Sequence, residues 1–510
     1  MFRKKVLFIT AFAISFLGCK KDVEPQSTLD KSEVVNENLE EKFANVSPKL
    51  TSDNASPLLD FIFTADPTAV EYEGRIYVYA TNDHQQYEHV GKDGKNGYGH
   101  IRTLVMMSSD DMVNWTYHGL INTADLAPWT QNSWAPSITS RLEADGKTHF
   151  YLYYSNSGIG TAVLTSTSPV GPWSDPLGKN IVDRSVPGVD VEAPFDPGVL
   201  IDDQGAGWLT FGGGTPKTDY MPDNARIVKL GADMISLASD VAKIPAPYFF
   251  EASELNFING TYVYTYNTNW TDRTEWPYGH IDIPTKCNMS YMTSKTPLDP
   301  DSWEYRDNYF KNTGEDNVGP WTNNHTHLFK FKEKYYIAYH AMYLQDYFDT
   351  KGGFRNVGIE EMQVDEEHVN ILMGKATFEG PSQLNPLNPF DLQQAETTAG
   401  TSGQVQFEAV GKPGNMVAKG KADKQCLMVR GADFSKQIPA KFEARVKGKG
   451  KIDVYVNNLK GAPLVSLICD GKEWATLSEK IERTIDKGVG NIYFVFNGED
   501  LLFDEWKFIN

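Results

Sequence analysis

The chain has 510 residues, a formal net charge of −19 at pH 7 and an aromatic content of 12%. This length exceeds one ordinary domain, so we expect two domains with flanking segments. The strong negative charge argues against nucleic acid or an anionic membrane surface as a partner, whereas a neutral polysaccharide is compatible with it.

The N-terminus resembles a bacterial lipoprotein signal. Basic residues at positions 3–5 precede the apolar run VLFITAFAISFLG, which is too short for a transmembrane helix and ends at Cys19. We expect residues 1–19 to be a signal peptide with a lipidated Cys19; the alternative is an ordinary cleaved secretion signal. Residues 20–56 are polar and predict a flexible tether. The protein would be anchored in the cell envelope, at the outer membrane surface or the periplasmic face, and would touch the membrane only through this lipid.

Residues 57–385 contain five copies of one pattern, in which a lead residue is followed by small or polar positions, an apolar residue, a turn and an aromatic-rich strand. Alternating side chains and short turns predict that each copy is the inner hairpin of an antiparallel sheet. Such sheets cannot bury both faces alone, so five of them predict a five-bladed β-propeller. The leads are Asp66, Trp134, Asp196, Glu251 and His325, each with an apolar residue four positions later.

These leads are expected to gather at one mouth of the channel, because the inner strands of a propeller surround a single axis. Three of them are carboxylates, and converging carboxylates in an aromatic site suit glycoside hydrolysis. Tyr248 and Phe250 precede Glu251, and partial desolvation of its carboxyl favours the protonated form that an acid catalyst needs. Asp66 and Asp196 share an Asp-Pro dipeptide, and the alternative for each is an aspartate that caps a strand entry.

Two aromatic residues and a histidine complete the candidates of the propeller. Trp134 offers a flat face for a sugar, and Phe250 adjoins the expected acid, so we assign both to substrate binding. His325 aligns with the carboxylates and is expected to point down the channel towards a cation or ordered waters. The alternative for His325 is a hydrogen-bonded structural role.

A Pro-rich boundary, EGPSQLNPLNPFDL, follows the last repeat. Beyond it, residues 390–510 contain short alternating segments such as QVQFEAV and NIYFVFNG, without helical periodicity. This spacing predicts a β-sandwich of the jelly-roll type, so that the whole chain is all-β.

The motifs A-D-P, W-A-P, D-P-G-V-L with D-D-Q-G, F-E-A-S and N-N-H with a distal Y-H occur in order within residues 57–380. Together they resemble the motifs of glycoside hydrolase family 43. The resemblance implies five-bladed propeller enzymes that hydrolyse arabinose- and xylose-containing glycans with inversion and without an organic cofactor. It further implies that Asp66 is the general base, that Glu251 is the general acid, that Asp196 tunes the pKa of this acid, and that a calcium ion accompanies His325.

Residues 391–510 resemble a family 6 carbohydrate-binding module, from Q-A-E-T-T-A-G at the start to F-D-E-W-K-F at the end. This resemblance implies a structural calcium ion near Glu396 and Asp504 and an aromatic sugar clamp. Trp474 is the obvious aromatic for the clamp, and its alternative is a place in the core.

These inferences together predict an inverting α-L-arabinofuranosidase that removes arabinofuranosyl side chains from arabinoxylan, a plant polysaccharide. Alternatives within the same family are β-xylosidase, arabinanase and exo-β-galactanase. A different class of protein, a non-catalytic surface glycan-binding lipoprotein, is disfavoured because a binding site gains little from three mutually repelling carboxylates. The oligomeric state is left open by the sequence.

Overall fold

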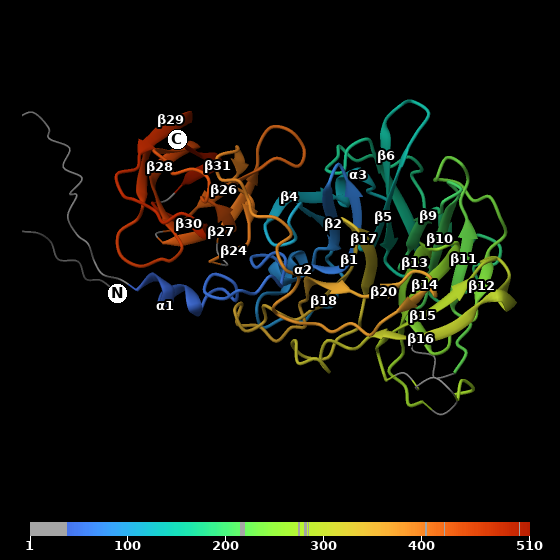
Figure 1. The fold of residues 1–510 in the computed structure, drawn as a ribbon. Coiled ribbons are helices and arrows are strands. Elements are labelled where there is room, and N and C mark those ends of the chain that lie inside the picture. Colours follow the sequence, from blue (N-terminus) through green and yellow to red (C-terminus); the bar gives the residue numbers. More distant parts are fainter. Residues whose placement is uncertain are drawn as a thin grey trace, which may run out of the picture. The chain divides into compact units, whose positions relative to one another are not determined.

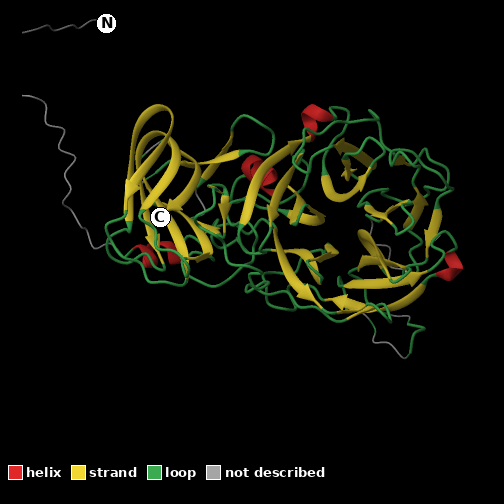
Figure 2. Ribbon diagram, turned by 45° about the horizontal axis from the view of Figure 1, so that its top comes forward, coloured by secondary structure: helices red, strands yellow, loops and turns green. Residues whose placement is uncertain are grey.

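A computed structural model describes residues 38–214, 220–273, 276–279, 283, 285–402, 405–422, 424–498 and 500–510. Strands make up nearly all of the regular structure in these ranges, as Figure 2 shows in yellow. The helices there are α1 (Leu39–Ala44), α2 (Asp83–Val90), α3 (Thr123–Leu126) and the 3-10 helix η1 (Pro300–Ser302). None of these described helices is long and apolar enough to cross a membrane. The predicted signal peptide and Cys19 lie outside the described residues.

Five antiparallel sheets form the propeller, which confirms the predicted fold (Figure 1). The first sheet contains β1 (Ala65–Tyr72), β2 (Arg75–Thr81), β3 (Thr103–Ser109), β4 (Trp115–Asn122) and β23 (Thr397–Thr398). The second contains β5 (Trp134–Leu142), β6 (Thr148–Asn156), β7 (Gly160–Ser166) and β8 (Val182–Asp183). The third contains β9 (Gly198–Ile201), β10 (Gly207–Gly212), β11 (Ala225–Lys229) and β12 (Ala242–Ile244).

The fourth sheet contains β13 (Phe249–Ile258), β14 (Thr261–Thr268), β15 (Met289–Ser294) and β16 (Glu304–Phe310). The fifth contains β17 (Thr326–Phe331), β18 (Lys334–Ala341) and β19 (Asn356–Met362). A short pair, β20 (Val364–Asp365) and β21 (Asn370–Ile371), follows it. The first strands of successive sheets contact one another, and β17 contacts β1, so the ring of inner strands is closed.

Backbone hydrogen bonds between distant parts of the chain complete this closure. The N–H of Leu58 donates to the carbonyl of Val357, and the N–H of Thr64 donates to the carbonyl of Arg355, both at 2.9 Å. Residues 57–64 therefore lie along β19, at the edge of the fifth sheet, and join it to the strand that begins the first sheet.

Tight turns join the inner pair of strands in three of the sheets. In each turn two consecutive residues adopt positive φ angles, 50° and 77° at Glu73 and Gly74, for example, and 46° and 72° at Asn259 and Gly260. Two-residue turns with positive φ match the right-handed twist of paired strands, which is why they close hairpins. Lys332 and Glu333 form the same turn with φ values of 46° and 66°, without a glycine.

The C-terminal strands form one nine-stranded sheet that curls into a sandwich-like unit, in agreement with the predicted all-β class. Its buried core contains six phenylalanines and Trp506, which is 1% exposed, packed among aliphatic residues. Its strands are β22 (Gln393–Gln394), β24 (Gly400–Thr401), β25 (Gln406–Ala409), β26 (Met416–Gly420), β27 (Gln425–Asp433), β28 (Lys441–Val456), β29 (Val465–Lys480), β30 (Val489–Asn497) and β31 (Leu501–Ile509).

Residues 38–56, which the sequence assigns to the tether, contain helix α1 and are largely packed against this sheet. Leu39, Phe43 and Leu50 share a core cluster with residues of the C-terminal sheet such as Tyr493. The tether prediction is wrong for this stretch, because scattered apolar residues in a polar segment were sufficient to dock it. A short strand also links the start of the C-terminal region to the propeller, since β23 pairs with β4 of the first propeller sheet.

Candidate active site

Distortions near the start of the inner strands position the candidate carboxylates. Asp66 and Asp196 have φ angles of 48° and 49°, and the same left-handed conformation occurs at Ala135 (40°) and Ala252 (60°). In β1, β5 and β13 the strand register shifts around this residue, as it does at a β-bulge. A bulge bends the strand and re-aims its side chains, and bulges are frequent next to active sites.

The bulges show that the five lead residues of the repeats are not all equivalent in position. Asp66 and Asp196 are themselves the left-handed residues, whereas Glu251 comes one position before the left-handed residue of its strand. The same offset holds for Trp134, which precedes Ala135. The alignment of all five leads as equivalent positions is therefore wrong by one residue in two repeats. Propeller sheets bury both faces, so the apolar residue four positions after each lead can lie on either face. It therefore does not define the register of the strand.

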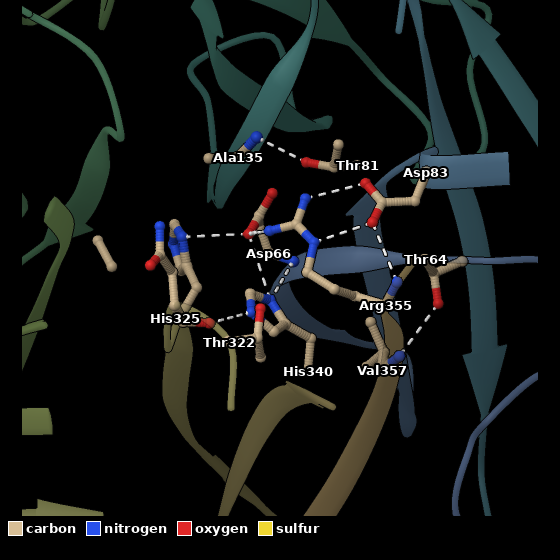
Figure 3. A network of polar contacts seen from close by, with 12 residues as sticks. Thr64, Asp66, Thr81, Asp83, Ala135, Thr322, His325, His340, Arg355 and Val357 are labelled. Carbon is tan, nitrogen blue, oxygen red and sulfur yellow. Dashed lines mark hydrogen bonds and ion pairs between the residues drawn. The ribbon is translucent and has the colours of Figure 1, made fainter. Parts of the chain in front are cut away.

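Asp66 is 7% exposed and lies in a basic environment (Figure 3). Nη1 of Arg355 donates to its Oδ1 at 2.8 Å, and its own backbone N–H donates to Nδ1 of His340 at 3.1 Å. Burial alone would raise the pKa of Asp66, but the guanidinium of Arg355 and the imidazoles of His340 and His325 hold that pKa well below its usual range. Asp66 is therefore ionised throughout the physiological pH range.

The opposite shift occurs at the two other candidate carboxyl groups. Burial, followed by the charges of Asp196 and Asp66, raises the pKa of Glu251 well above its usual range. Burial and the charge of Asp66 likewise raise the pKa of Asp196. Oδ2 of Asp196 accepts a hydrogen bond of 3.0 Å from the N–H of Ala252, so Asp196 is tied to the residue that follows Glu251.

The backbone at Gly213 packs directly against the strand that carries Glu251. A Cβ atom at Gly213 would lie 2.2 Å from the carbonyl oxygen of Phe250 and 3.0 Å from Cα of Glu251. Only glycine fits at such a contact. The residue that follows β10 of the third sheet thus lies in close contact with the backbone of Glu251.

This arrangement pairs an ionised carboxylate with a protonated carboxyl group. Titratable groups whose environments push their pKa values apart are the usual basis of combined acid and base catalysis. One carboxyl that donates a proton and one carboxylate that accepts a proton are the groups that glycoside hydrolysis requires, and this chemistry uses no organic cofactor.

His325 lies between the two aspartates, and Figure 3 shows its approach to Asp66. Its Nδ1 is 3.6 Å from Oδ1 of Asp66 and 3.9 Å from Oδ2 of Asp196. Burial lowers the pKa of His325 to about 4, so the ring is neutral at neutral pH. Its buried Nε2 has no hydrogen-bond partner among the described residues, which suits a metal ion or a water molecule.

The implied calcium ion fits this point only in part. Across the described residues, no three His, Cys, Asp or Glu side chains form a group that could hold a metal. A cation beside His325 would have to take most of its remaining ligands from water.

The predicted sugar-binding residues of the propeller have different surroundings. Trp134 is partly exposed, its Nε1–H donates to the carbonyl of Tyr98 at 3.1 Å, and the two rings are 6.3 Å apart. Phe250 is only 8% exposed and contributes mainly to the core around the acid strand. A second aromatic pair, Trp270 and Trp321, has ring centroids 6.1 Å apart.

One asparagine connects this second aromatic pair to Glu251. Nε1–H of Trp270 donates to Oδ1 of Asn323 at 2.9 Å, and Asn323 also hydrogen-bonds Glu251. Trp321 is 46% exposed, so this wall of the site presents an open aromatic surface.

In the C-terminal sheet, Trp474 is partly exposed, and the guanidinium of Arg445 lies 4.5 Å from its ring centroid.

Glu396 and Asp504 each retain one buried carboxylate oxygen without a partner among the described residues. Burial raises the pKa of Glu396 to about 8. The N–H of Ala395 donates to the carbonyl of Asp504 at 2.8 Å, so the two acidic residues belong to adjacent segments. Unpartnered carboxylate oxygens suit a calcium ion. However, Oδ2 of Asp504 pairs with Arg445, and no three acidic, His or Cys side chains of the described residues form a group that could hold a metal, so the implied ion fits here only in part.

Sequence reasoning missed Arg355, Asp83 and Tyr98, which complete the surroundings of Asp66. Arg355 precedes β19 and Asp83 begins α2, so neither belongs to the inner hairpins from which the repeats were recognised. His340 lies on β18, the second strand of the fifth hairpin, where the repeat pattern singles out only the lead residue His325. The position of an arginine near a strand end would not have distinguished Arg355 from Arg226, which is also buried in the structure.

Comparison with known proteins decides the family. A profile described as "Glycosyl hydrolases family 43" matches residues 56–369, well over half of the chain. The chain belongs to glycoside hydrolase family 43. It is 35% identical over 487 residues to an "Arabinoxylan arabinofuranohydrolase" of Bacillus subtilis, covering 89% of this chain and 92% of the relative. A protein of the same name from Paenibacillus polymyxa is 34% identical, with 89% and 74% covered.

A solved structure extends this similarity to the whole fold. It is the crystal structure of a family 43 arabinoxylan arabinofuranohydrolase from Bacillus subtilis in complex with cellotetraose. The two structures share 33% sequence identity with a TM-score of 0.83, over 91% of this chain and 99% of the other. The similarity therefore includes the C-terminal sheet as well as the propeller.

The raised pKa of Glu251 leads to a prediction for Asp196→Asn. An acid catalyst must keep its proton, so with Glu251 in the predicted role of acid we expect activity to fall as the pH rises through the pKa of Glu251. Removal of the Asp196 charge lowers that pKa, and the alkaline limb of the pH–rate profile should move to lower pH. Because burial also raises the pKa of Glu251, part of the elevation should remain. Asp203→Asn, in an exposed turn, serves as the control. An unchanged alkaline limb at the normal rate would contradict the coupling.

Proposed function

We propose that this protein is an arabinofuranosidase that removes arabinofuranosyl side chains from arabinoxylan. The observation that carries the proposal is the opposed protonation of Asp66 and Glu251 in a family 43 propeller. Relatives named for the arabinoxylan reaction share about a third of their residues with this chain over most of its length and support the choice of substrate.

The direct test is to incubate the purified protein with arabinoxylan, linear xylan, arabinan and galactan and to identify the released sugars by chromatography. We expect arabinose from arabinoxylan and no shortening of the xylan backbone. Release of xylose from linear xylan would favour a β-xylosidase, and release of galactose from galactan would favour an exo-β-galactanase. The absence of any released sugar would favour the non-catalytic glycan-binding alternative.

In the proposed mechanism, Asp66 removes a proton from the attacking water while Glu251 protonates the oxygen of the leaving xylan chain. The two groups act on opposite faces of the arabinose ring, so the configuration at the anomeric carbon inverts. Asp196 supports the acid, because its charge raises the pKa of Glu251 and its carboxylate holds the N–H of Ala252. Proton NMR of the first-formed arabinose should show the inverted anomer.

The roles of the two groups can be separated by the leaving group of the substrate. Asp66→Asn should lose activity on every substrate, because every substrate needs an activated water. Glu251→Gln should lose activity on arabinoxylan by about 10²-fold to 10⁴-fold, the usual contribution of one acid or base. The same variant should lose much less on an aryl arabinofuranoside with an acidic phenol, which departs without protonation. Equal losses of Glu251→Gln on both substrates would argue against its role as the acid.

For the C-terminal sheet we propose a role in carbohydrate binding, of the family 6 type. The partly exposed Trp474 and the unpaired oxygens of Glu396 and Asp504 support this role. A second sugar contact on the same chain raises the effective concentration of enzyme at an insoluble polysaccharide.

Trp474→Ala tests this binding role. We expect the variant to bind insoluble arabinoxylan less tightly in a pull-down assay while it hydrolyses a small aryl substrate at the normal rate. Thr476→Ala, an exposed change on the same strand, should leave both properties unchanged. Unaltered retention of the Trp474 variant on the polysaccharide would exclude Trp474 from the binding surface.

We also propose that the protein is anchored in the cell envelope by a lipid on Cys19. The motif FLGC after a basic and apolar leader supports this location. Incorporation of labelled palmitate into the wild-type chain, but not into Cys19→Ser, would support the anchor, and soluble release of both chains would contradict it.

A further inference from the structure

Arg355 joins two carboxylates that come from different elements of the propeller. Its Nη1 donates to Oδ1 of Asp66 at 2.8 Å. On the opposite side its Nε donates to Oδ2 of Asp83 at 2.8 Å, and its Nη2 donates to Oδ1 of Asp83 at 2.9 Å. Figure 3 shows the guanidinium between the two carboxylates. The bidentate bond therefore goes to Asp83, and the single bond goes to Asp66.

Asp83 is fully buried and is held more tightly than Asp66. Besides the two guanidinium bonds, its Oδ2 accepts from the backbone N–H of Arg355 at 3.1 Å and from Nδ2 of Asn96 at 2.7 Å. Asp83 is the first residue of α2, so a helix fixes its backbone. Bidentate arginine–carboxylate bonds restrict the guanidinium to one orientation.

The contacts of Asp66 leave one of its two carboxylate oxygens free. All recorded contacts of the Asp66 carboxylate, with Arg355, His340 and His325, go to Oδ1, so Oδ2 has no partner within the described part of the chain. A carboxylate needs such an uncommitted oxygen to accept a proton from water. An arginine without a second partner prefers to grip one carboxylate with two parallel N–H groups, which would occupy both oxygens of Asp66.

The same aspartate connects the site to an aromatic loop. Asn96 belongs to residues 91–102, and its backbone N–H also donates to the carbonyl of Gly352 at 2.8 Å. In this loop the ring of Tyr98 lies over the guanidinium of Arg355, 5.1 Å from ring centroid to Cζ. The carbonyl of Tyr98 in turn accepts the Nε1–H of Trp134. Asp83 is thus linked to Asp66 through Arg355, and it is linked to the loop that carries Tyr98 through Asn96.

We propose that Asp83 is a positioning residue for the reaction. By occupying the Nε and Nη2 edge of Arg355, it limits Asp66 to one guanidinium bond and keeps Oδ2 of Asp66 available to the attacking water. Asp83 does not touch substrate in this role. The proposal rests on the proposed function of Asp66 as the base.

Asp83→Asn is the variant that tests it. The amide retains the size of the side chain, but its NH₂ group faces a donor of Arg355 and cannot accept a hydrogen bond. The guanidinium should then turn towards Asp66. We expect kcat to fall about 10-fold to 100-fold, the effect of a misplacement of about 1 Å in a catalytic group, with KM changed less than about threefold.

Leaving-group dependence distinguishes this effect from damage to the acid. Because water must be activated for every substrate, the loss in Asp83→Asn should be equal on arabinoxylan and on an aryl arabinofuranoside. Glu251→Gln should show unequal losses in the same assays. Asp202→Asn is the matched control, since Asp202 is also buried and accepts bonds from Trp208 and Tyr262, but it lies in a hairpin turn away from the site. The control should retain wild-type kcat even where its thermal midpoint falls.

A chemical rescue provides a second, independent measurement. Asp83→Ala leaves a hole that formate can enter, and formate restores a carboxylate opposite the free edge of Arg355. All assays are run well below the unfolding midpoint of each variant, so that a loss of fold does not mimic a loss of rate. We expect saturable recovery of kcat with formate in Asp83→Ala and none in Asp66→Asn.

The outcomes distinguish a failure of the proposed role of Asp66 from a failure of the proposed role of Asp83. An active Asp66→Asn would overturn the proposed role of Asp66 itself. If Asp66→Asn is inactive while Asp83→Asn stays within about twofold of wild-type kcat, Asp66 is the base and Asp83 does not position it. A change in KM alone, or a loss in Asp83→Ala that formate does not reverse, would likewise overturn the positioning role.

Discussion

The guanidinium of Arg355 is the charge on which the candidate site depends. Buried carboxylates ordinarily take up protons, because the protein interior stabilises charge poorly. Arg355 offsets this penalty for Asp66, whereas Asp196 and Glu251 are held by neutral donors such as Ser155 and Asn323. One cation placed off-centre among three acidic groups thus produces an ionised carboxylate on one side and a protonated carboxyl on the other.

The location of Arg355 links this local asymmetry to the closure of the propeller. Its carbonyl accepts the N–H of Thr64, two residues before Asp66, and the carbonyl of Val357 accepts the N–H of Leu58. The hydrogen bonds that join the last sheet to the first therefore lie beside the residues that hold Asp66 in place. An error in ring closure would displace Arg355 from Asp66 directly, so global fold and site geometry are stabilised by the same contacts.

The C-terminal sheet is structurally continuous with the part of the chain that leads into the propeller. Asp60 accepts hydrogen bonds from the N–H and the hydroxyl of Thr401, and the buried Nζ of Lys49 donates to the carbonyls of Pro57 and Leu58. Because residues 57–64 also close the propeller ring, the C-terminal unit contacts the segment that completes the catalytic fold. This continuity agrees with the similarity of the solved family 43 structure over 91% of the chain.

The sequence by itself determined the all-β class, the propeller and the three acidic residues, because short-range patterns record them. Alternating strands, two-residue turns and Asp-Pro dipeptides are local features, and five copies of them were sufficient to predict a common axis. The sequence did not determine the bulges that place Glu251 one position out of register with Asp66, because sheets buried on both faces accept apolar residues in either register. Only the tertiary structure assigned Arg355 and Asp83 to the site, since 272 residues separate them along the chain. Their pairing depends on ring closure, and no local pattern encodes a contact between a helix start in one blade and a strand entry in another.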